Sequence, residues 1–297
     1  MLGLATDGLT RGALNERTDT VLQPGYREDL LVVFPEAGTY CLIDGEQEPA
    51  ETVNNEPNGR ELLGYVEVAA GAVTAPGATP VTSILDALIA SAEANLPAAV
   101  SEEIVAGLRD GMRLAAFVEH PDVAESEISG KQTLGFRIID ANIADPVRFQ
   151  FEVGELGRDF DGHLVLKSAA PYDPRRIDRT LVLGGVDEWT LTSFGGGHPF
   201  HIHVNPFQIV DVLDADGVDV SGPGDPNQSQ YANLKGTWKD TLFVEEGQVI
   251  KIRTRYQRYI GEFVLHCHIL DHEDKGMMQN VRIAIPDGQG GATAAHH

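Results

Sequence analysis

Short apolar and β-branched runs alternate with turn residues along the second half of the chain, from about residue 132 to residue 286. Turns such as DADG, GPGDPN and EEG separate these runs, which are LGFRIID, RFQFEV, RTLVLGGVDEWTLTSF, PFQIVDVL, DTLFV, QVIKIRTRY, GEFVLHCHIL and NVRIAI. Many short strands between Gly- and Pro-rich turns are typical of a β-sandwich or barrel. We therefore expect a mainly β fold, with residues 133–286 forming one β domain and residues 287–297 a flexible tail.

The first part of the chain also contains β-rich runs. DLLVVF and TYCLI lie on either side of Pro35 and Gly38, a spacing that predicts a hairpin at the end of a β domain. Cys41, in the second run, is expected to be a small buried apolar residue. Residues 1–49 are therefore expected to be the closing strands of a β domain whose beginning this chain lacks.

Two helices are expected in a linker over residues 50–132, after a polar stretch with one short strand, LLGYVEV. The segments SILDALIASAEANL and SEEIVAGLRDGMRLAAFV are separated at Pro97, and each opens with a serine that can cap a helix. The first helix should pack on a neighbour through one apolar face, formed by Ile84, Leu85, Leu88 and Ala92. Met112 is expected to fill a core, and we assign no chemistry to this linker.

Composition excludes several kinds of partner. The 45 acidic and 22 basic residues give a net charge of -23, which repels nucleic-acid phosphates and anionic lipid surfaces. No apolar run is long enough to predict a membrane-spanning helix. The opening MLGLATDGLTRG is interrupted by Asp7 and therefore lacks the unbroken apolar core of an export signal. Two cysteines, Cys41 and Cys267, are too few for a disulfide framework.

The candidate chemistry lies in two short windows, GGGHPFHIHVNPF and HCHILDHEDKGMM. Their histidines and cysteine are His198, His201, His203, His266, Cys267, His268 and His272. If LHCHIL is a strand, successive side chains point to opposite faces, so His266 and His268 share one side and Cys267 faces the other. One strand would then offer a thiolate to one site and two imidazoles to a second site.

On the face to which the Cys267 sulfur would point, the donors are those of a blue-copper electron-transfer site. Thiolate and thioether favour Cu(I), and imidazole suits both oxidation states. These donors are His198, Cys267, His272 and Met277. The imidazoles that remain for the other side could hold part of a multinuclear copper cluster; they are His201, His203, His266 and His268. A zinc site built from the same residues is the alternative, although a Cys and a Met ten residues apart with a His between them match copper better.

The two windows resemble the C-terminal copper motifs of the multicopper oxidases, the family of laccases and bacterial cuprous oxidases. The segments VDEWTLTS, WKDTLFV and GQVIKIRTRY agree with this resemblance. LQPGYREDLLVVFPEAGTYCLID resembles the closing strands of the cupredoxin domain that precedes the last one in three-domain members. The resemblance covers about residues 1–49 and 133–286, and it implies a cupredoxin-like Greek-key β-sandwich for the last domain.

The resemblance also implies roles for single residues. The implied type 1 copper ligands are His198, Cys267, His272 and Met277. The implied type 2 ligand is His201, and the implied type 3 ligands are His203, His266 and His268. In the family, the histidine that matches His272 faces the reducing substrate, and the acid that matches Glu273 assists proton delivery during oxygen reduction.

The chain departs from the family in the number of histidines. A complete trinuclear cluster in the family uses eight, four of them from two His-x-His motifs of an N-terminal cupredoxin domain, and no such motif occurs outside the two windows. His120 and His163 have no ligand partner near them in sequence and are expected to be ordinary polar residues. Self-association cannot restore the set, because each copy lacks the same residues. We therefore expect a C-terminal fragment of a longer oxidase, with the missing N-terminal cupredoxin domains as partners.

The expected function is that of the longer oxidase of which this chain would be a fragment. A laccase-like oxidase would oxidise phenolic, aromatic or metal-ion donors at type 1 copper and reduce dioxygen to water, and this chain alone would be inactive. The alternative is a blue-copper electron-transfer module without oxidase activity, although a simple carrier does not need histidines on both sides of its cysteine. The family resemblance also implies a periplasmic or secreted location.

Overall fold

The computed structural model describes residues 1–49, 52, 56–71, 79–114, 120–139, 150–224, 229–288 and 292–293. They divide into two compact units. The N-terminal unit comprises Met1–Leu22, Tyr26–Gln47 and Asn58–Pro121, and the C-terminal unit comprises Gln23–Gly25, Glu48–Pro57 and Asp122–His297. The short segment Gln23–Gly25 therefore belongs to the C-terminal unit although it lies early in the sequence.

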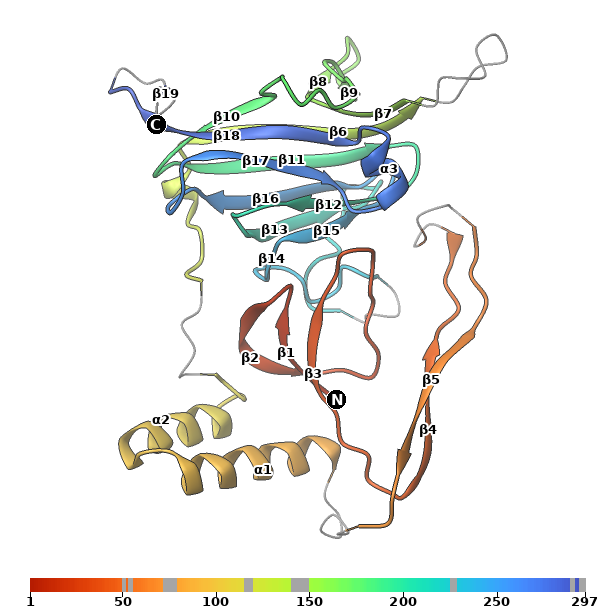
Figure 1. Ribbon diagram of the computed structural model, residues 1–297, viewed down its shortest axis with the longest axis vertical. Coiled ribbons are helices and arrows are strands. Elements are labelled where there is room, and N and C mark those ends of the chain that lie inside the picture. Colours follow the sequence, from red (N-terminus) through yellow and green to blue (C-terminus); the bar gives the residue numbers. More distant parts are fainter. Residues whose placement is uncertain are drawn as a thin grey trace. The chain divides into compact units, whose positions relative to one another are not determined.

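Two large sheets make up most of the C-terminal unit (Figure 1). One has the order β10-β18-β17-β12-β15, with β19 paired to β18; its strands are β10 Arg179–Val182, β12 His198–Ile202, β15 Thr241–Val244, β17 Gly261–Cys267, β18 Met278–Pro286 and β19 Ala292–Thr293. The other has the order β14-β13-β16-β11-β6-β7; its strands are β6 Gly130–Ile139, β7 Gln150–Gly154, β11 Val186–Phe194, β13 Phe207–Leu213, β14 Trp238–Lys239 and β16 Val249–Arg255.

The two sheets pack through their apolar inner faces. Strand β16 shows why these faces are apolar: Ile250 and Ile252 are buried while Lys251 between them is only half-buried, as the alternation of side chains along a strand requires. The ring centroid of Phe200 on β12 lies 6.3 Å from that of Trp189 on β11 and 6.5 Å from that of Phe136 on β6. The expected mainly β sandwich is therefore confirmed.

Two of the predicted strand runs differ in the structure. RTLVLGGVDEWTLTSF forms two strands, β10 and β11, because the chain turns between them at Gly184, whose φ is +84°. GEFVLHCHIL is a strand only as far as Cys267, and a short helix, α3 Leu270–Asp274, follows it. His268 therefore lies in the turn directly after β17. The first residues of RFQFEV lie outside the described residues, and β7 begins at Gln150.

Several short elements of the C-terminal unit were not predicted from the sequence pattern. Strand β14 precedes the predicted run DTLFV, and β19 lies within residues 287–297, which were expected to be a flexible tail. Strands β8 Leu156–Arg158 and β9 Leu164–Leu166 form an antiparallel hairpin. The 3-10 turn η2, Glu125–Glu127, precedes β6.

The N-terminal unit contains a sheet whose first two strands the hydrophobic pattern did not predict. Strands β1 Leu2–Thr6, β2 Leu9–Glu16 and β3 Glu28–Leu31 form an antiparallel sheet of order β2-β1-β3. The predicted hairpin between DLLVVF and TYCLI is wrong, because β3 pairs with β1 and β4 Gly38–Asp44 pairs with β5 Glu61–Val68. Strand β4 finds a partner of matching length in β5, and such tertiary pairing outweighs the local turn signal.

The β4–β5 hairpin also overturns the prediction for Cys41. Its side chain is exposed, and so are the large apolar side chains of Leu42, Leu62 and Tyr65 on the same hairpin. Two strands alone cannot cover both of their faces. Cys41 is therefore not the small buried apolar residue that its sequence context predicts.

Helices α1 Pro80–Asn95 and α2 Ala98–Arg109 form the predicted pair, but their caps differ from the prediction. Helix α1 is capped by Thr79, whose hydroxyl accepts a hydrogen bond from the backbone N–H of Thr82, and α2 has Pro97 at its cap without a side-chain hydrogen bond. Ile84 and Ala92 are buried, so the expected apolar face of α1 is confirmed. The last residues of the second predicted helix, 115–118, lie outside the described residues.

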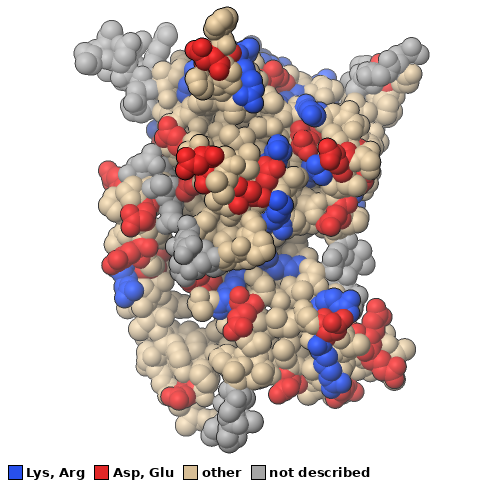
Figure 2. Space-filling model, turned by 180° about the vertical axis from the view of Figure 1, so that it is seen from behind, with Lys and Arg blue, Asp and Glu red and all other residues tan. Residues whose placement is uncertain are grey.

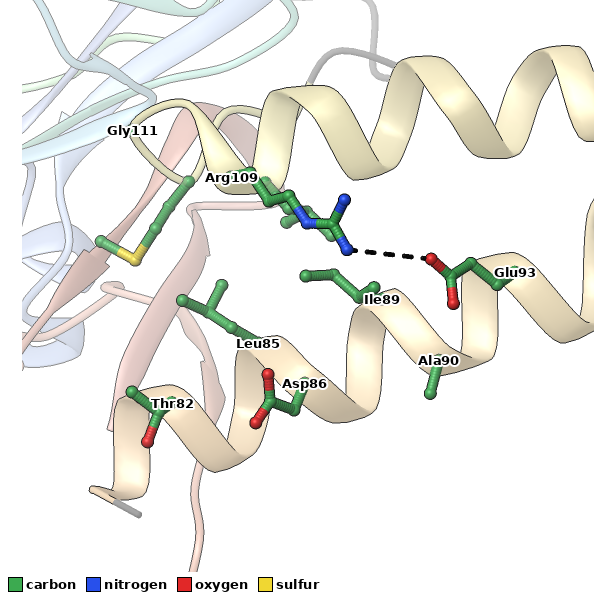
Figure 3. A pocket seen from close by; sticks show the side chains of 10 residues that line it. Thr82, Leu85, Asp86, Ile89, Ala90, Glu93, Arg109 and Gly111 are labelled. Atoms are coloured by element: carbon green, nitrogen blue, oxygen red, sulfur yellow. Dashed lines mark ion pairs between the residues drawn. The ribbon is translucent and has the colours of Figure 1, made fainter. Parts of the chain in front are cut away.

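A pocket of about 500 Å³ lies between the two helices (Figure 3). Leu85 and Ile89 of α1 line it, and the guanidinium of Arg109 on α2 lies 3.9 Å from the carboxylate of Glu93. Met112 also lines the pocket and packs against the apolar cluster of this unit, as expected for a core residue. The residues that line the pocket include no histidine or cysteine, so the candidate chemistry lies elsewhere.

Figure 2 shows Asp and Glu side chains distributed over one face of the molecule, with Lys and Arg side chains among them. Among the described residues, no helix has the length and apolar character needed to cross a bilayer.

Candidate metal centre

Strands β12 and β17 bring the two histidine windows together. They pair antiparallel, with Phe200 opposite Cys267 and His201 opposite His266. Directly opposed residues of an antiparallel pair project to the same face of a sheet. Phe200 and Cys267 belong to the fully buried core of the sandwich, so His201 and His266 project to the other face. Neighbouring side chains of β17 therefore serve two different sites.

The thiolate group consists of His198, Cys267 and His272. The Sγ atom of Cys267 lies 3.7 Å from Nδ1 of His198 and 3.7 Å from Nδ1 of His272, and the two Nδ1 atoms are 3.2 Å apart. One metal ion, with bonds of about 2.0 Å to nitrogen and about 2.3 Å to sulfur, could be held by donor atoms this close to one another. The three donors fit one ion.

Hydrogen bonding leaves a metal-facing nitrogen free in this group. The Nε2 atom of His198 lies 3.2 Å from the carbonyl oxygen of Gly195, which can accept its proton, so Nδ1 points toward the sulfur with a lone pair. Burial, aided by the neighbouring His272, lowers the pKa of His198 to about 3, and burial raises the pKa of the Cys267 thiol to about 12. Both donors are thus neutral at neutral pH, and metal binding must release the thiol proton.

Met277 adjoins the thiolate group at the end of the turn that follows α3. It is fully buried, its carbonyl accepts a hydrogen bond of 3.0 Å from the N–H of Cys267, and its own N–H donates to the carbonyl of His272 at 2.9 Å. These two hydrogen bonds tie residue 277 to two members of the group. A thioether is a weak ligand that favours Cu(I), so a methionine beside this group suits copper.

The imidazole group consists of His201, His203, His266 and His268. The ligand nitrogens of the first three lie within 4.8 Å of one another, and the Nε2 atoms of His203 and His266 are 3.2 Å apart. The ring centroid of His268 lies 5.3 Å from that of His201 and 5.5 Å from that of His266. Burial lowers the pKa of His203 and lowers the pKa of His266 to about 4. The lowered pKa favours the neutral form of His203 and His266, which is the form that binds metals.

His201 is oriented by two residues that sequence reasoning did not single out. Its Nδ1 atom lies 2.9 Å from Oγ1 of Thr241 and 2.9 Å from the carbonyl oxygen of Asp240. A proton on Nδ1 that is donated to these oxygens leaves Nε2 available to a metal. The available signal was the segment WKDTLFV, since its strand β15 pairs with β12, but that pairing cannot be read from the sequence.

Glu273 orients His266 from the other side of the imidazole group. Its Oε2 atom lies 3.2 Å from Nδ1 of His266, which also lies 3.0 Å from the carbonyl oxygen of Cys267. The side chain of Glu273 is 25% exposed, so the carboxylate touches both the imidazole group and the solvent. It therefore connects His266 to the solvent.

The two isolated histidines take no part in either group. His163 is exposed and its Nδ1 atom lies 3.4 Å from the carboxylate of Asp159; with Asp161 they form an exposed surface group. His120 is half-buried and lies outside the three groups of ligand atoms that the described residues form.

The chain is similar in sequence and in fold to known copper oxidases. The family model for multicopper oxidases matches residues 140–287. A laccase of Haloferax volcanii is 32% identical over 142 residues, which are 47% of this chain and 21% of that protein. A laccase of Bacillus subtilis is 32% identical over 132 residues, which are 41% of this chain and 25% of that protein.

Solved structures extend the likeness to nearly the whole chain, at identities that show the fold alone. A multicopper oxidase from Campylobacter jejuni, described as a metallo-oxidase, gives a TM-score of 0.61 at 19% identity and covers 96% of this chain and 49% of that one. The laccase-like CueO of a lignin-degrading Ochrobactrum gives 0.58 at 23% identity, with 95% and 50% covered. The chain thus spans about half the length of these structures, and its matches span a quarter or less of the laccases.

The two-sheet sandwich has the cupredoxin-like fold of the multicopper oxidase structures that it resembles. Through residues 140–287 the chain belongs to the multicopper oxidase family, a family of copper-dependent oxidoreductases.

Proposed function

We propose that this chain is the C-terminal part of a laccase-like multicopper oxidase. The observation that carries the proposal is the placement of Cys267 and His266 on opposite faces of β17, with each side chain inside its own group of donors. Bound copper would supply one-electron oxidation of a phenolic, aromatic or metal-ion donor and reduction of dioxygen to water. The polypeptide would hold both donor groups a few covalent bonds apart.

Each group has a distinct role in this proposal. The thiolate group with Met277 would be the type 1 site, and half-buried His272 would be its contact with the reducing donor. The imidazole group would supply one type 2 ligand, His201, and three type 3 ligands, His203, His266 and His268. Glu273 would hold and deliver protons at the oxygen-reducing site, a role supported by its place between His266 and solvent.

The proposal includes a partner. The imidazole group offers four of the eight histidines that the family's trinuclear cluster uses, and the related structures are about twice as long as this chain. A further cupredoxin domain with two His-x-His motifs would supply the remaining four. Dioxygen would be reduced only by the completed protein.

A second candidate is an electron-transfer module, and one observation favours it. The thiolate group draws all its donors from the C-terminal unit, whereas the imidazole group offers only part of a cluster. This chain alone could therefore exchange single electrons without reducing oxygen.

The test is to load the purified chain with copper and measure its absorption, its copper content and its turnover of a phenolic dye. We expect an intense thiolate-to-copper absorption band and no turnover above that of free copper. Adding or fusing a cupredoxin domain with the two missing motifs should start oxygen consumption. Robust turnover by the chain alone would contradict the need for a further cupredoxin domain. A copper-loaded chain without the thiolate-to-copper absorption band would contradict the type 1 assignment.

A further inference from the structure

One segment far from the histidine windows in sequence lies against the imidazole group. Gln23–Gly25 belongs to the C-terminal unit. A Cβ atom added at residue 25 would lie 2.6 Å from both Cγ and Cδ2 of His268 and 3.1 Å from its Nδ1. Real Cβ atoms do not approach other atoms this closely, so the backbone of Gly25 fits against the imidazole only because it has no side chain.

The turn that presents Gly25 is fixed in two ways. Gly25 has a φ of +86°, a conformation that L-residues with a side chain adopt only with strain. Gln23, at the start of the segment, donates a hydrogen bond of 3.1 Å from Nε2 to Oε1 of Gln230, and Gln230 in turn donates to Glu245 at 2.9 Å. The turn is therefore anchored to the C-terminal unit beside the ring that it contacts.

His268 differs from its neighbours in how its ring is held. His201 is fixed by the hydroxyl of Thr241, and His266 by the carboxylate of Glu273. For His268, the hydrogen bond found within the described residues is that of its backbone N–H to the carbonyl of Pro199, at 2.9 Å, so rotation of its ring is limited by packing, against the rings of His201 and His266 among others. The contact with Gly25 blocks part of that rotation.

We propose that Gly25 is a positioning residue for His268, and that the Gln23–Gly25 turn forms one wall of the imidazole group. In place of a hydrogen bond, a close-packed backbone sets the direction in which the His268 ring presents its nitrogens. This inference rests on the proposed function, since it treats His268 as a copper ligand.

The test compares Gly25→Ala with Gly247→Ala in the full chain. Gly247 has a φ of +83° and no atom within 4 Å of an added Cβ, so both substitutions strain the backbone alike and only the first collides with His268. Supporting groups of a metal ligand typically change metal affinity by 10- to 100-fold. We expect Gly25→Ala to weaken Cu(II) binding by the imidazole group about tenfold or more and to change its paramagnetic resonance spectrum. Gly247→Ala should leave both unchanged, and the thiolate absorption band should be the same in all three proteins.

A measurement without metal keeps the inference testable if the imidazole group binds copper weakly. In the copper-free chain with ¹⁵N-labelled histidine, Gly25→Ala should shift the ring resonances of His268 more than those of His201. Unchanged His268 resonances in Gly25→Ala, or copper affinities equal to those of Gly247→Ala, would overturn the inference. Loss of the thiolate band in the unmodified chain would instead count against the proposed function, so the two failures are distinguishable.

Discussion

The thiolate group and the imidazole group lie on opposite faces of one strand but are enclosed differently. Cys267 and His198 are fully buried in the sandwich core. His201, His203 and His268 retain exposed surface, and the ring of His268 is bounded by a turn from the start of the chain. A site that one domain encloses can be complete in that domain, whereas a site on an outer face can accept donors from another domain. This difference in burial would allow one polypeptide to carry one whole metal site and part of a second.

The largest effect is expected when the thiolate alone is removed. We expect Cys267→Ser to abolish the intense absorption band and to lower copper content by one ion per chain, since an uncharged hydroxyl cannot replace a thiolate as a soft ligand. The imidazole group should keep its copper, because its donors do not include Cys267. Simultaneous loss of copper from both groups, measured by metal analysis and paramagnetic resonance, would show that the groups are not independent.

The next test uses pH, because copper affinity at the thiolate group should depend on it. Burial raises the pKa of the Cys267 thiol to about 12, so the metal-free fold favours the protonated thiol, and copper binding must expel that proton. Affinity at the thiolate group should therefore rise about tenfold per pH unit between pH 6 and 8, with the release of one proton. Calorimetry in buffers of different ionisation enthalpy measures that release. Binding by the thiolate group without proton release would contradict a protonated resting thiol.

A smaller effect is expected from the hydroxyl that orients His201. Thr241→Val keeps the shape of the side chain but removes the hydrogen bond to Nδ1, so copper affinity at the imidazole group should fall about tenfold. The thiolate band should stay unchanged. Thr180→Val, on the exposed surface of β10, is the matched control and should alter neither group. Equal copper affinities of the two variants would show that Thr241 does not support copper binding by His201.

The smallest expected effect concerns backbone strain beside His203. Val204 has a φ of +70°, a conformation that is costly for a β-branched residue, and its side chain is 50% exposed. Val204→Gly should raise the free energy of unfolding by up to about 1 kcal/mol, since relief of strain outweighs the added chain entropy. Val218→Gly, at an exposed valine outside the positive-φ region, should lower it. Urea unfolding of both variants measures the difference, and equal losses of stability would show that Val204 is not strained.

Local spacing explains what could be predicted from the sequence. The alternation of His266 and Cys267 along one strand and the inward-facing residues of β16 depend on neighbours in the chain, so both could be expected before the structure was known. The partner of β4 and the exposure of Cys41 depend on which strand pairs with which, and the turn signal at Pro35 and Gly38 pointed to the wrong partner.

The supporting residues of the imidazole group lay beyond sequence reasoning for the same reason. Thr241 and Asp240 reach His201 because β15 pairs with β12, and Gly25 reaches His268 through the packing of the folded C-terminal unit. A glycine in LQPGYR reads locally as a turn residue. Its contact with a ring near the other end of the chain becomes visible only in three dimensions.

The most direct test of the central claim is a crystal structure of the copper-loaded chain with anomalous scattering measured at the copper edge. We expect one copper peak bonded to Sγ of Cys267 between His198 and His272. We also expect separate copper density on the opposite face of β17, among the ring nitrogens of the imidazole group. A single peak shared by both faces, or copper bound only to the imidazoles with Cys267 unligated, would contradict the central claim.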